Sequence, residues 1–244
     1  MNPIELAQSV TLSEELLRIQ NSIKEKGYAL TSDKALGLPA DMHQYINSTF
    51  YTDDLLGPEV PGLPPHDRLR VRDVIEYKRR SGILLLNEYP IITMRPVADV
   101  VVPREYNRTY TLESSQLVTW ISNVLSMIPP EDQYDHGTME INFVRTFQHI
   151  TACKHQDNEH FVGVYVTARE CQGAITSLYP LESPDDALLD VVLQPGEYIF
   201  FRDADFFHNT TPLEPRFEGD QPHRDAVVVC VSYAGTYLKA TWLP

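Results

Sequence analysis

The sequence of 244 residues is poor in cysteine, with only Cys153, Cys171 and Cys230, and no two of these have the short spacing of a zinc site. An odd number of cysteines does not fit a framework of disulfides. We therefore expect free, buried thiols and a reducing, cytoplasmic location. The first residues lack the basic segment and apolar run of a signal peptide, and no apolar run approaches the length of a membrane span.

Basic residues are also scarce, since 20 Lys and Arg face 34 Asp and Glu, for a formal net charge of −14. Nucleic acids and anionic membranes bind through basic patches that neutralise phosphate. The short cluster Lys78-Arg79-Arg80 is too small to form such a patch. We therefore expect a small-molecule substrate, with no nucleic acid or membrane partner. The sequence indicates no particular oligomeric state.

Several motifs of hydrolytic and phosphate chemistry are missing. There is no glycine-rich phosphate loop and no Gly-x-Ser-x-Gly nucleophile elbow. A zinc peptidase needs His-Glu-x-x-His on a helix, and the segment 155–160, His-Gln-Asp-Asn-Glu-His, does not have that spacing. These absences argue against a hydrolase.

Helical patterns occupy the first half of the chain. Thr11-Leu12-Ser13-Glu14 is typical of a capping box, and apolar residues at 12, 16, 19 and 23 predict a helix that ends at Gly27. A second short helix is expected from about Ala40 to Phe50. The longest apolar stripe predicts a helix from Ser114 to Ile128, which Pro129-Pro130 ends.

Strand patterns dominate the rest. Arg68 to Arg72 alternates at period two with its arginines on one face. After Pro130 the expected strands are 139–150, 161–168, 174–179, 188–193, 197–202 and 225–233. Helices followed by regularly spaced strands predict a mostly β fold with flanking helices, an antiparallel sandwich or jelly roll. We expect one domain over 1–244, with a helical and mixed part (1–130) packed on the main jelly-roll core (131–244).

One constellation points to metal chemistry. In a strand, residues two apart project to the same side, so His155 and Asp157 could reach one ion. His208, much later in the chain, could supply a third ligand. Two imidazoles and a carboxylate suit a divalent iron with open positions. A His-x-Asp alone is weak evidence, because a hydrogen-bonded surface pair looks the same.

Arg224 gives that constellation a context. It opens an apolar run from Asp225 to Tyr233, where an unpaired guanidinium would be costly to bury. A carboxylate ligand would satisfy it, and so would a structural ion pair with Asp203 or Asp205. We favour the ligand because of the metal motif upstream.

With these segments the chain resembles the iron(II)/2-oxoglutarate-dependent dioxygenases, and more narrowly the bacterial branch of L-isoleucine dioxygenase-like free amino-acid hydroxylases. The matching segments are 155–159 (His-Gln-Asp-Asn-Glu), 207–213 (Phe-His-Asn-Thr-Thr-Pro-Leu), 224–225 (Arg-Asp) and 231–233 (Val-Ser-Tyr). The resemblance covers about the last two-thirds of the chain. Where relatives often carry a Gly-Gly step, this chain has Gln172-Gly173-Ala174.

The resemblance implies a double-stranded β-helix of the jelly-roll, cupin-like kind, with Fe(II), 2-oxoglutarate and O₂ as cofactor and cosubstrates. His155, Asp157 and His208 would bind the iron. Arg224 would hold the far carboxylate of 2-oxoglutarate, with help from Thr210. The implied reaction is hydroxylation of an unactivated C–H bond, with release of succinate and CO₂. A related halogenase would need a small residue in place of Asp157.

Three residues are candidates for binding the substrate. Glu159 continues the odd-numbered side of the motif and could accept an ammonium group, although a surface carboxylate or a structural brace is equally compatible with it. Arg145 shares a face with Ile141 and Phe143, so we expect it to point into the barrel and bind a substrate carboxylate or pair internally. Arg72 is an alternative carboxylate clamp.

Two other functions fit parts of the pattern. A tailoring oxygenase of natural-product biosynthesis could use the same site to desaturate, epoxidise or cyclise a larger substrate. A non-catalytic jelly-roll binding protein is less favoured, because a site that had lost its catalytic function would be expected to have lost at least one metal ligand.

Overall fold

The computed structural model describes residues 3–7, 13–58, 68–89, 93–97, 100–104, 108–147 and 153–233. The helices are α1 (Glu14–Lys26), α2 (Met42–Phe50) and α3 (Ser115–Met127), with short 3₁₀ turns η1 (Thr111–Glu113), η2 (Pro130–Asp132) and η3 (Asp203–Asp205). The strands are β1 (Ile4–Ala7), β2 (Tyr28–Ser32), β3 (Gly57–Pro58), β4 (Arg68–Arg80), β5 (Ile83–Glu88), β6 (Thr93–Val97), β7 (Val100–Arg104), β8 (His136–Thr146), β9 (Phe161–Glu170), β10 (Gln172–Gly173), β11 (Thr176–Pro180), β12 (Leu189–Val191), β13 (Glu197–Arg202), β14 (Phe206–Thr210), β15 (Leu213–Glu214) and β16 (His223–Tyr233).

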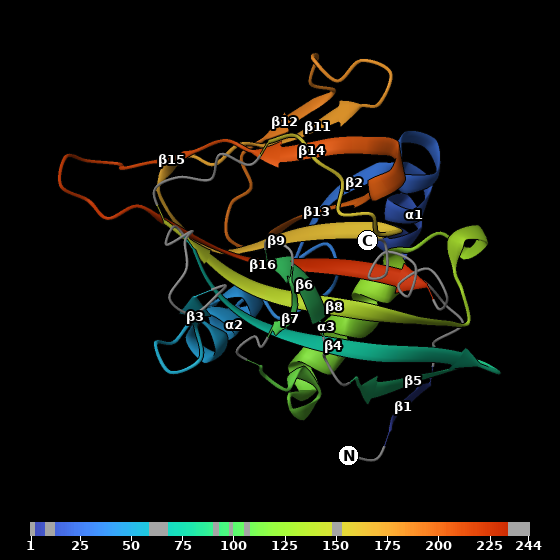
Figure 1. The fold of residues 1–244 in the computed structure, drawn as a ribbon. Helices are drawn as coiled ribbons and strands as arrows, with labels where there is room; N and C mark the ends of the chain where they lie inside the picture. Colours follow the sequence, from blue (N-terminus) through green and yellow to red (C-terminus); the bar gives the residue numbers. More distant parts are fainter. Residues whose placement is uncertain are drawn as a thin grey trace.

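A large antiparallel sheet forms the base of the molecule (Figure 1). Its strand order is β1-β5-β4-β8-β16-β9-β13-β2, with β3 paired beside β4. Strands from the first 130 residues thus lie at both ends of the sheet, around a centre made of β8, β16 and β9. The mostly β class with flanking helices and a jelly-roll core is confirmed.

The helices cover one face of this sheet. Alternate residues of the central strands, such as Ile141 and Phe143 of β8 and Val229 of β16, are fully buried in one apolar cluster with residues of all three helices. Strand periodicity explains the arrangement, because successive side chains point to opposite faces. The intervening residues of β8 and β16 therefore face the opposite side.

A smaller sheet lies over that opposite face. Its order is β12-β11-β14, and it lies above β13 and β9 in Figure 1. A second apolar cluster joins the sheets, with Val162 and Val166 of β9 and Ile199 of β13 packed against Leu178 of β11 and Phe206 of β14. The two sheets are closed at this end and leave a cavity between them further along.

The expected helices are largely confirmed. α2 buries Met42, Ile46 and Phe50, and α3 ends before Pro129 as its sequence predicts. The start of the first helix was placed too early: Ser13 is the N-cap, its side chain accepting from the backbone N–H of Leu16, and Thr11 lies outside the described residues. Gly27 ends α1 in the left-handed conformation, with φ of 80°.

Strand predictions hold with small shifts in their ends, and 197–202 agrees at both ends. The expected strand 139–150 begins earlier, at His136, and is described to Thr146, while residues 148–150 lie outside the described part. Ala174 is not in a strand; it has a positive φ of 48° beside β10, and β11 begins at Thr176.

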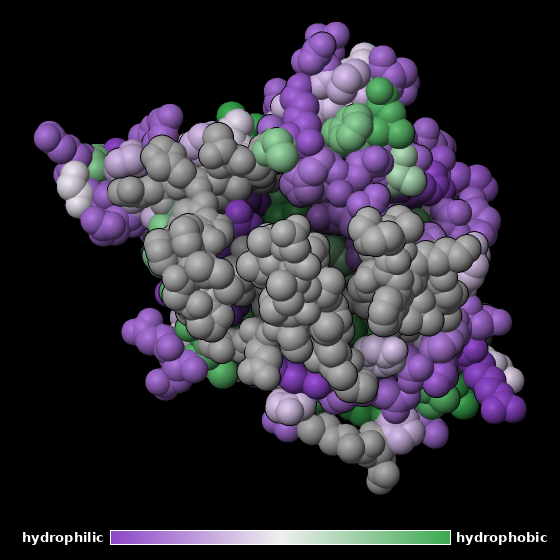
Figure 2. Space-filling view, viewed as in Figure 1, coloured by the Kyte–Doolittle hydropathy of each residue, from purple (hydrophilic) through white to green (hydrophobic). Residues whose placement is uncertain are grey.

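The cysteine prediction is correct in two of three cases. All three cysteines are free; Cys171 and Cys230 are buried, whereas Cys153 is exposed. No helix in the described part of the chain has both the length and the apolar character needed to cross a membrane. Figure 2 shows a mainly hydrophilic described surface on this side, in keeping with the charge of −14.

The expected orientation of Arg145 is wrong, whereas the alternative of an internal pair with a carboxylate is confirmed. It lies on the helix-facing side of β8, where its Nε and Nη2 atoms donate to the Asp225 carboxylate of β16 at 2.8 and 2.7 Å. Asp225 is fully buried and also accepts from Asn47 of α2 at 2.6 Å. Arg145 shares the odd-numbered face of β8, as its sequence predicts, but that face packs on the helices. The Asp225 carboxylate therefore links β16 to β8 through Arg145 and to α2 through Asn47.

We predict that Arg145→Met lowers the free energy of unfolding by about 3–5 kcal/mol, because it leaves the buried Asp225 carboxylate without its charged partner. Urea unfolding followed by circular dichroism would measure the loss. The double variant Arg145→Met/Asp225→Leu removes both charges and should recover much of it. A loss below about 1 kcal/mol for Arg145→Met would contradict this role.

Candidate functional site

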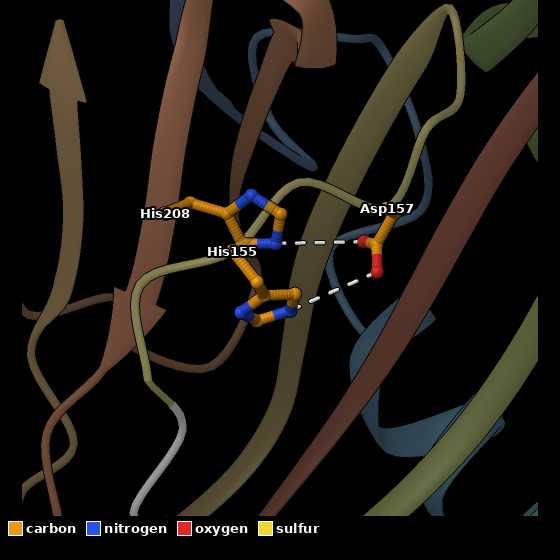
Figure 3. Close-up of side chains that lie close together, drawn as sticks. All are labelled: His155, Asp157 and His208. Atoms are coloured by element: carbon orange, nitrogen blue, oxygen red, sulfur yellow. Dashed lines mark ion pairs between the residues drawn. The ribbon is translucent and has the colours of Figure 1, made fainter. Parts of the chain in front are cut away.

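Three side chains from separate parts of the chain meet at the edge of the smaller sheet (Figure 3). His155 and Asp157 come from the loop between β8 and β9, and His208 comes from β14. One ligand atom of each lies within 4.8 Å of the others. Asp157 Oδ1 is 3.7 Å from His155 Nε2, and Asp157 Oδ2 is 3.4 Å from His208 Nε2.

The backbone, more than the side chains, brings the two histidines together. His155 and His208 form an isolated antiparallel bridge, in which each N–H donates to the carbonyl of the other at 3.1 and 2.9 Å. The expectation that His155 and Asp157 lie in one strand is wrong. The loop bends after the bridge, and Asn158 has a positive φ of 62°. Gln156 holds the bend by donating to the Asp203 carbonyl at 2.8 Å.

Each histidine ring faces an acceptor with its second nitrogen. His155 Nδ1 lies 2.9 Å from the Cys153 carbonyl, which can only accept, so this nitrogen carries the proton and Nε2 is free to ligate. His208 Nδ1 lies 3.5 Å from the carboxylate of Asp203, a buried residue of η3. The other oxygen of Asp203 accepts from the Glu159 N–H at 3.1 Å.

Asp203 is a site residue that was not predicted from the sequence, where it was considered only as a possible ion-pair partner of Arg224. Sequence spacing gives no signal for it, because its orientation depends on the turn between β13 and β14. A carboxylate behind a histidine ligand fixes the ring and increases its basicity. The structure therefore places a support behind each of the two imidazoles.

The electrostatics favour an ionised carboxylate between the rings. Desolvation alone would raise the pKa of Asp157, but the hydrogen bond and charge of His208, followed by the charges of His155 and Arg70, lower it below its usual value. Two imidazole nitrogens and one ionised carboxylate that converge on one point are a donor set for a divalent transition metal. The residues present therefore fit such an ion.

The cluster opens on a cavity of about 390 Å³ between the two sheets. Arg68, Arg70 and Arg72 of β4 line it, which confirms that the alternating arginines share one face. Arg72 donates through Nε to Asn142 at 2.8 Å and forms an ion pair of 2.8 Å with Glu140. The even-numbered residues of β8 thus supply polar partners in the cavity, whereas its odd-numbered residues pack in the hydrophobic core.

Arg224 lies buried in the wall of this cavity, 5% exposed. The ion pair with Asp203 or Asp205 that could have satisfied it does not form, since Asp203 faces His208 and Asp205 faces Arg202. Arg224 Nη2 is 3.4 Å from Thr176 Oγ1, and its Nε is buried without a hydrogen-bond partner. Burial, and after it the charge of Arg169, lowers the pKa of Arg224 to about 10.

Thr210 and Glu159 also line the cavity. The Glu159 carboxylate accepts a hydrogen bond from the Ser232 hydroxyl, so it is braced from β16. Burial first, and then the nearby charges of Glu140, Asp157 and Asp203, raises the pKa of Glu159 to about 8. Of the predicted site residues, only Arg145 is absent from the cavity wall.

Residues 115–230 match the family described as 2OG-Fe dioxygenase. This region contains the His155–Asp157–His208 cluster and Arg224. No curated protein matches the chain by sequence.

Solved structures share the fold at low sequence identity. A bsmA homolog from Methylobium petroleophilum superposes with a TM-score of 0.74 and 16% identity, over 94% of this chain and 96% of its own. IDO from Bacillus thuringiensis superposes with a TM-score of 0.65 and 14% identity, over 93% of this chain and 99% of its own. The Fe(II)/(alpha)ketoglutarate-dependent dioxygenase TqaL superposes with a TM-score of 0.65 and 12% identity, over 90% of this chain and 87% of its own.

The family match covers the loop that carries His155 and Asp157 and the strands that carry His208 and Arg224, and the donor set suits a divalent iron. The match and the site together support an oxidoreductase enzyme that uses Fe(II), 2-oxoglutarate and O₂.

Proposed function

We propose that the enzyme hydroxylates an unactivated C–H bond of a small free amino acid or an amino-acid-like metabolite. The observation that carries this proposal is a cavity with both signs of charge around the metal-ligand cluster. Arginines of β4 line it together with the carboxylates of Glu140 and Asp157, and the positive charge of a bound ammonium group would favour the ionised form of Glu159. A zwitterion complements such walls, and a volume of about 390 Å³ shared with 2-oxoglutarate leaves room for a small substrate.

The proposed iron ligands are His155, Asp157 and His208. Their ligand atoms converge within 4.8 Å, and the second nitrogen of each imidazole already faces an acceptor. When bound, Fe(II) with 2-oxoglutarate supplies the oxidation by O₂, in which one oxygen atom enters the substrate and the other enters succinate as CO₂ leaves. The protein holds the substrate carbon near the cluster and excludes competing water.

Arg224 and Thr210 are the proposed partners of the far carboxylate of 2-oxoglutarate. The supporting observation is that Arg224 is buried in the cavity wall and has no carboxylate of the described chain within ion-pair distance. A guanidinium can bind a carboxylate through two parallel N–H donors. Thr210 lines the same cavity and offers a hydroxyl.

Glu159 is the proposed acceptor for the substrate ammonium group, and Arg72 is a candidate for its carboxylate. Glu159 has one oxygen held by Ser232, which fixes the direction of the carboxylate. Arg72 is held in turn by Asn142 and Glu140. Preorganised charges of this kind select a substrate by geometry as well as by charge. The likeness to the free amino-acid hydroxylase branch in the motif segments supports the same substrate class.

We predict that His208→Ala weakens Fe(II) binding by at least about 100-fold, because changes even outside the ligand set cost about 10- to 100-fold. Anaerobic equilibrium dialysis of Fe(II) would measure it. His136→Ala is the control, since His136 pairs with Glu76 far from the cavity wall. Succinate formation that persisted in His208→Ala would refute the iron site.

The substrate class is tested by succinate release across a panel of free amino acids, with Fe(II), 2-oxoglutarate and O₂ present. We expect at least one amino acid to stimulate succinate release and to gain one oxygen atom in the mass spectrum. Glu159→Gln should raise KM for that amino acid more than KM for 2-oxoglutarate, because it removes only the partner of the ammonium group. A product that loses two hydrogens instead would indicate desaturation, and no stimulation by any amino acid would contradict the proposed class.

A further inference from the structure

Two arginines lie side by side at the end of the cavity. Arg224 of β16 is the register partner of Arg169 of β9. A bulge brings them together: the register shifts between Asp225 and Ala226, so that Ala226 pairs with Val166 but Asp225 pairs with Ala168. Arg224 is 5% exposed and Arg169 is 7% exposed. Two like charges are thus buried on neighbouring strands.

Neither guanidinium has a counter-charge in the described chain. No carboxylate lies within ion-pair distance of either, and each retains a buried nitrogen without a hydrogen-bond partner, Nη1 of Arg169 and Nε of Arg224. Arg169 donates to the Gly173 carbonyl at 2.6 Å, and Arg224 contacts Thr176. Burying one unpaired charge is costly, and a second like charge beside it adds repulsion.

The one other buried arginine of the described chain is neutralised, since Arg72 pairs with Glu140. The half-buried Arg145 pairs with Asp225 in the same way. The neighbouring thiol of Cys171 does not supply a negative charge, because burial raises its pKa despite the adjacent arginines. The Arg169–Arg224 pair is therefore an arrangement that an added anion would stabilise.

The backbone around Gly173 holds Arg169 in place. Gly173 has a left-handed φ of 67° and pairs with Leu213 across β10 and β15, which directs its carbonyl to the guanidinium. Arg224 lines the cavity, whereas Arg169 is not part of its wall. Arg169 is thus fixed beside Arg224 on the neighbouring strand, outside the cavity wall.

We propose that Arg169 is a positioning residue that supplies the second positive charge of an anion site centred on Arg224, and that it selects cosubstrates with a far carboxylate. This inference rests on the proposed role of Arg224 in binding 2-oxoglutarate. The carboxylate relieves the repulsion between the two guanidinium groups when it binds, so part of its affinity comes from the pair rather than from Arg224 alone.

Calorimetric titration of the full chain loaded with Mn(II) tests the inference without turnover. Arg169→Gln should weaken 2-oxoglutarate binding by about tenfold, a smaller loss than removal of a direct ion-pair partner would cause, because Arg169 acts through Arg224. It should leave the affinity for oxalate, which chelates a metal but has no far carboxylate, within about twofold. Arg169→Lys keeps the charge and should stay within about threefold of the wild type for both ligands.

Arg216→Gln is the matched control. Arg216 donates to the backbone carbonyl of Arg169, so its removal disturbs the same part of β9, but its side chain is 42% exposed and pairs with Glu170, so its charge is screened. It should change neither affinity by more than about twofold. Arg169→Gln within twofold of wild type for 2-oxoglutarate, or an equal loss for both ligands, would overturn the inference.

If Arg169→Gln does not fold, NMR spectroscopy of the wild-type chain tests the inference instead. In its Zn(II) form with ¹⁵N-labelled arginine, the Nε–H signals of both Arg169 and Arg224 should move when 2-oxoglutarate binds, while that of Arg145, held by Asp225, should not. Movement of only one of the pair would overturn the inference. Wild-type protein that binds metal but not 2-oxoglutarate would instead refute the proposed function, so the two failures are distinguishable.

Discussion

The site depends on two backbone hydrogen bonds between His155 and His208. They join a loop of the large sheet to β14 of the smaller one, and so they set the distance between two imidazoles that are 53 residues apart in sequence. Backbone bonds suit this task because they carry no rotamer freedom. The backbone carbonyl of Cys153 and the carboxylate of Asp203 then face the second nitrogen of each ring. The bend of the loop after this bridge then brings the Asp157 carboxylate close to both rings.

The alternation of side chains along β8 and β16 separates stability from chemistry. One face of β8 carries Ile141 and Phe143 into the helical layer, and the other carries Glu140 and Asn142 to the cavity. The same alternation continues along β16, whose register with β8 is unbroken, so the Asp225 carboxylate faces Arg145 and the helices while Arg224 faces the cavity. The bulge lies in β9, where one extra residue between Val166 and Ala168 brings Arg169 opposite Arg224. A structural ion pair and a candidate anion site thus occupy consecutive residues.

Sequence periodicity predicted much of this, because amphipathic patterns report directly on burial. The helix at 114–128, the strand at 197–202 and the shared face of Arg68, Arg70 and Arg72 follow from spacing alone. Arg145 was misplaced because period two identifies which residues share a face but not which layer covers that face. The loop conformation of His155–Asp157 and the role of Asp203 depend on pairing with β14 and on the turn at η3, which no local pattern encodes. The contact of Arg169 with Arg224 arises from a bulge, and strand alternation predicts none.

The most direct test of the central claim is a crystal structure of the full chain with Mn(II) and 2-oxoglutarate, with the metal located by its anomalous scattering. The account predicts one anomalous peak coordinated by His155 Nε2, Asp157 and His208 Nε2, with the far carboxylate of 2-oxoglutarate against Arg224. A metal bound elsewhere, or a far carboxylate held by the arginines of β4 instead, would contradict it.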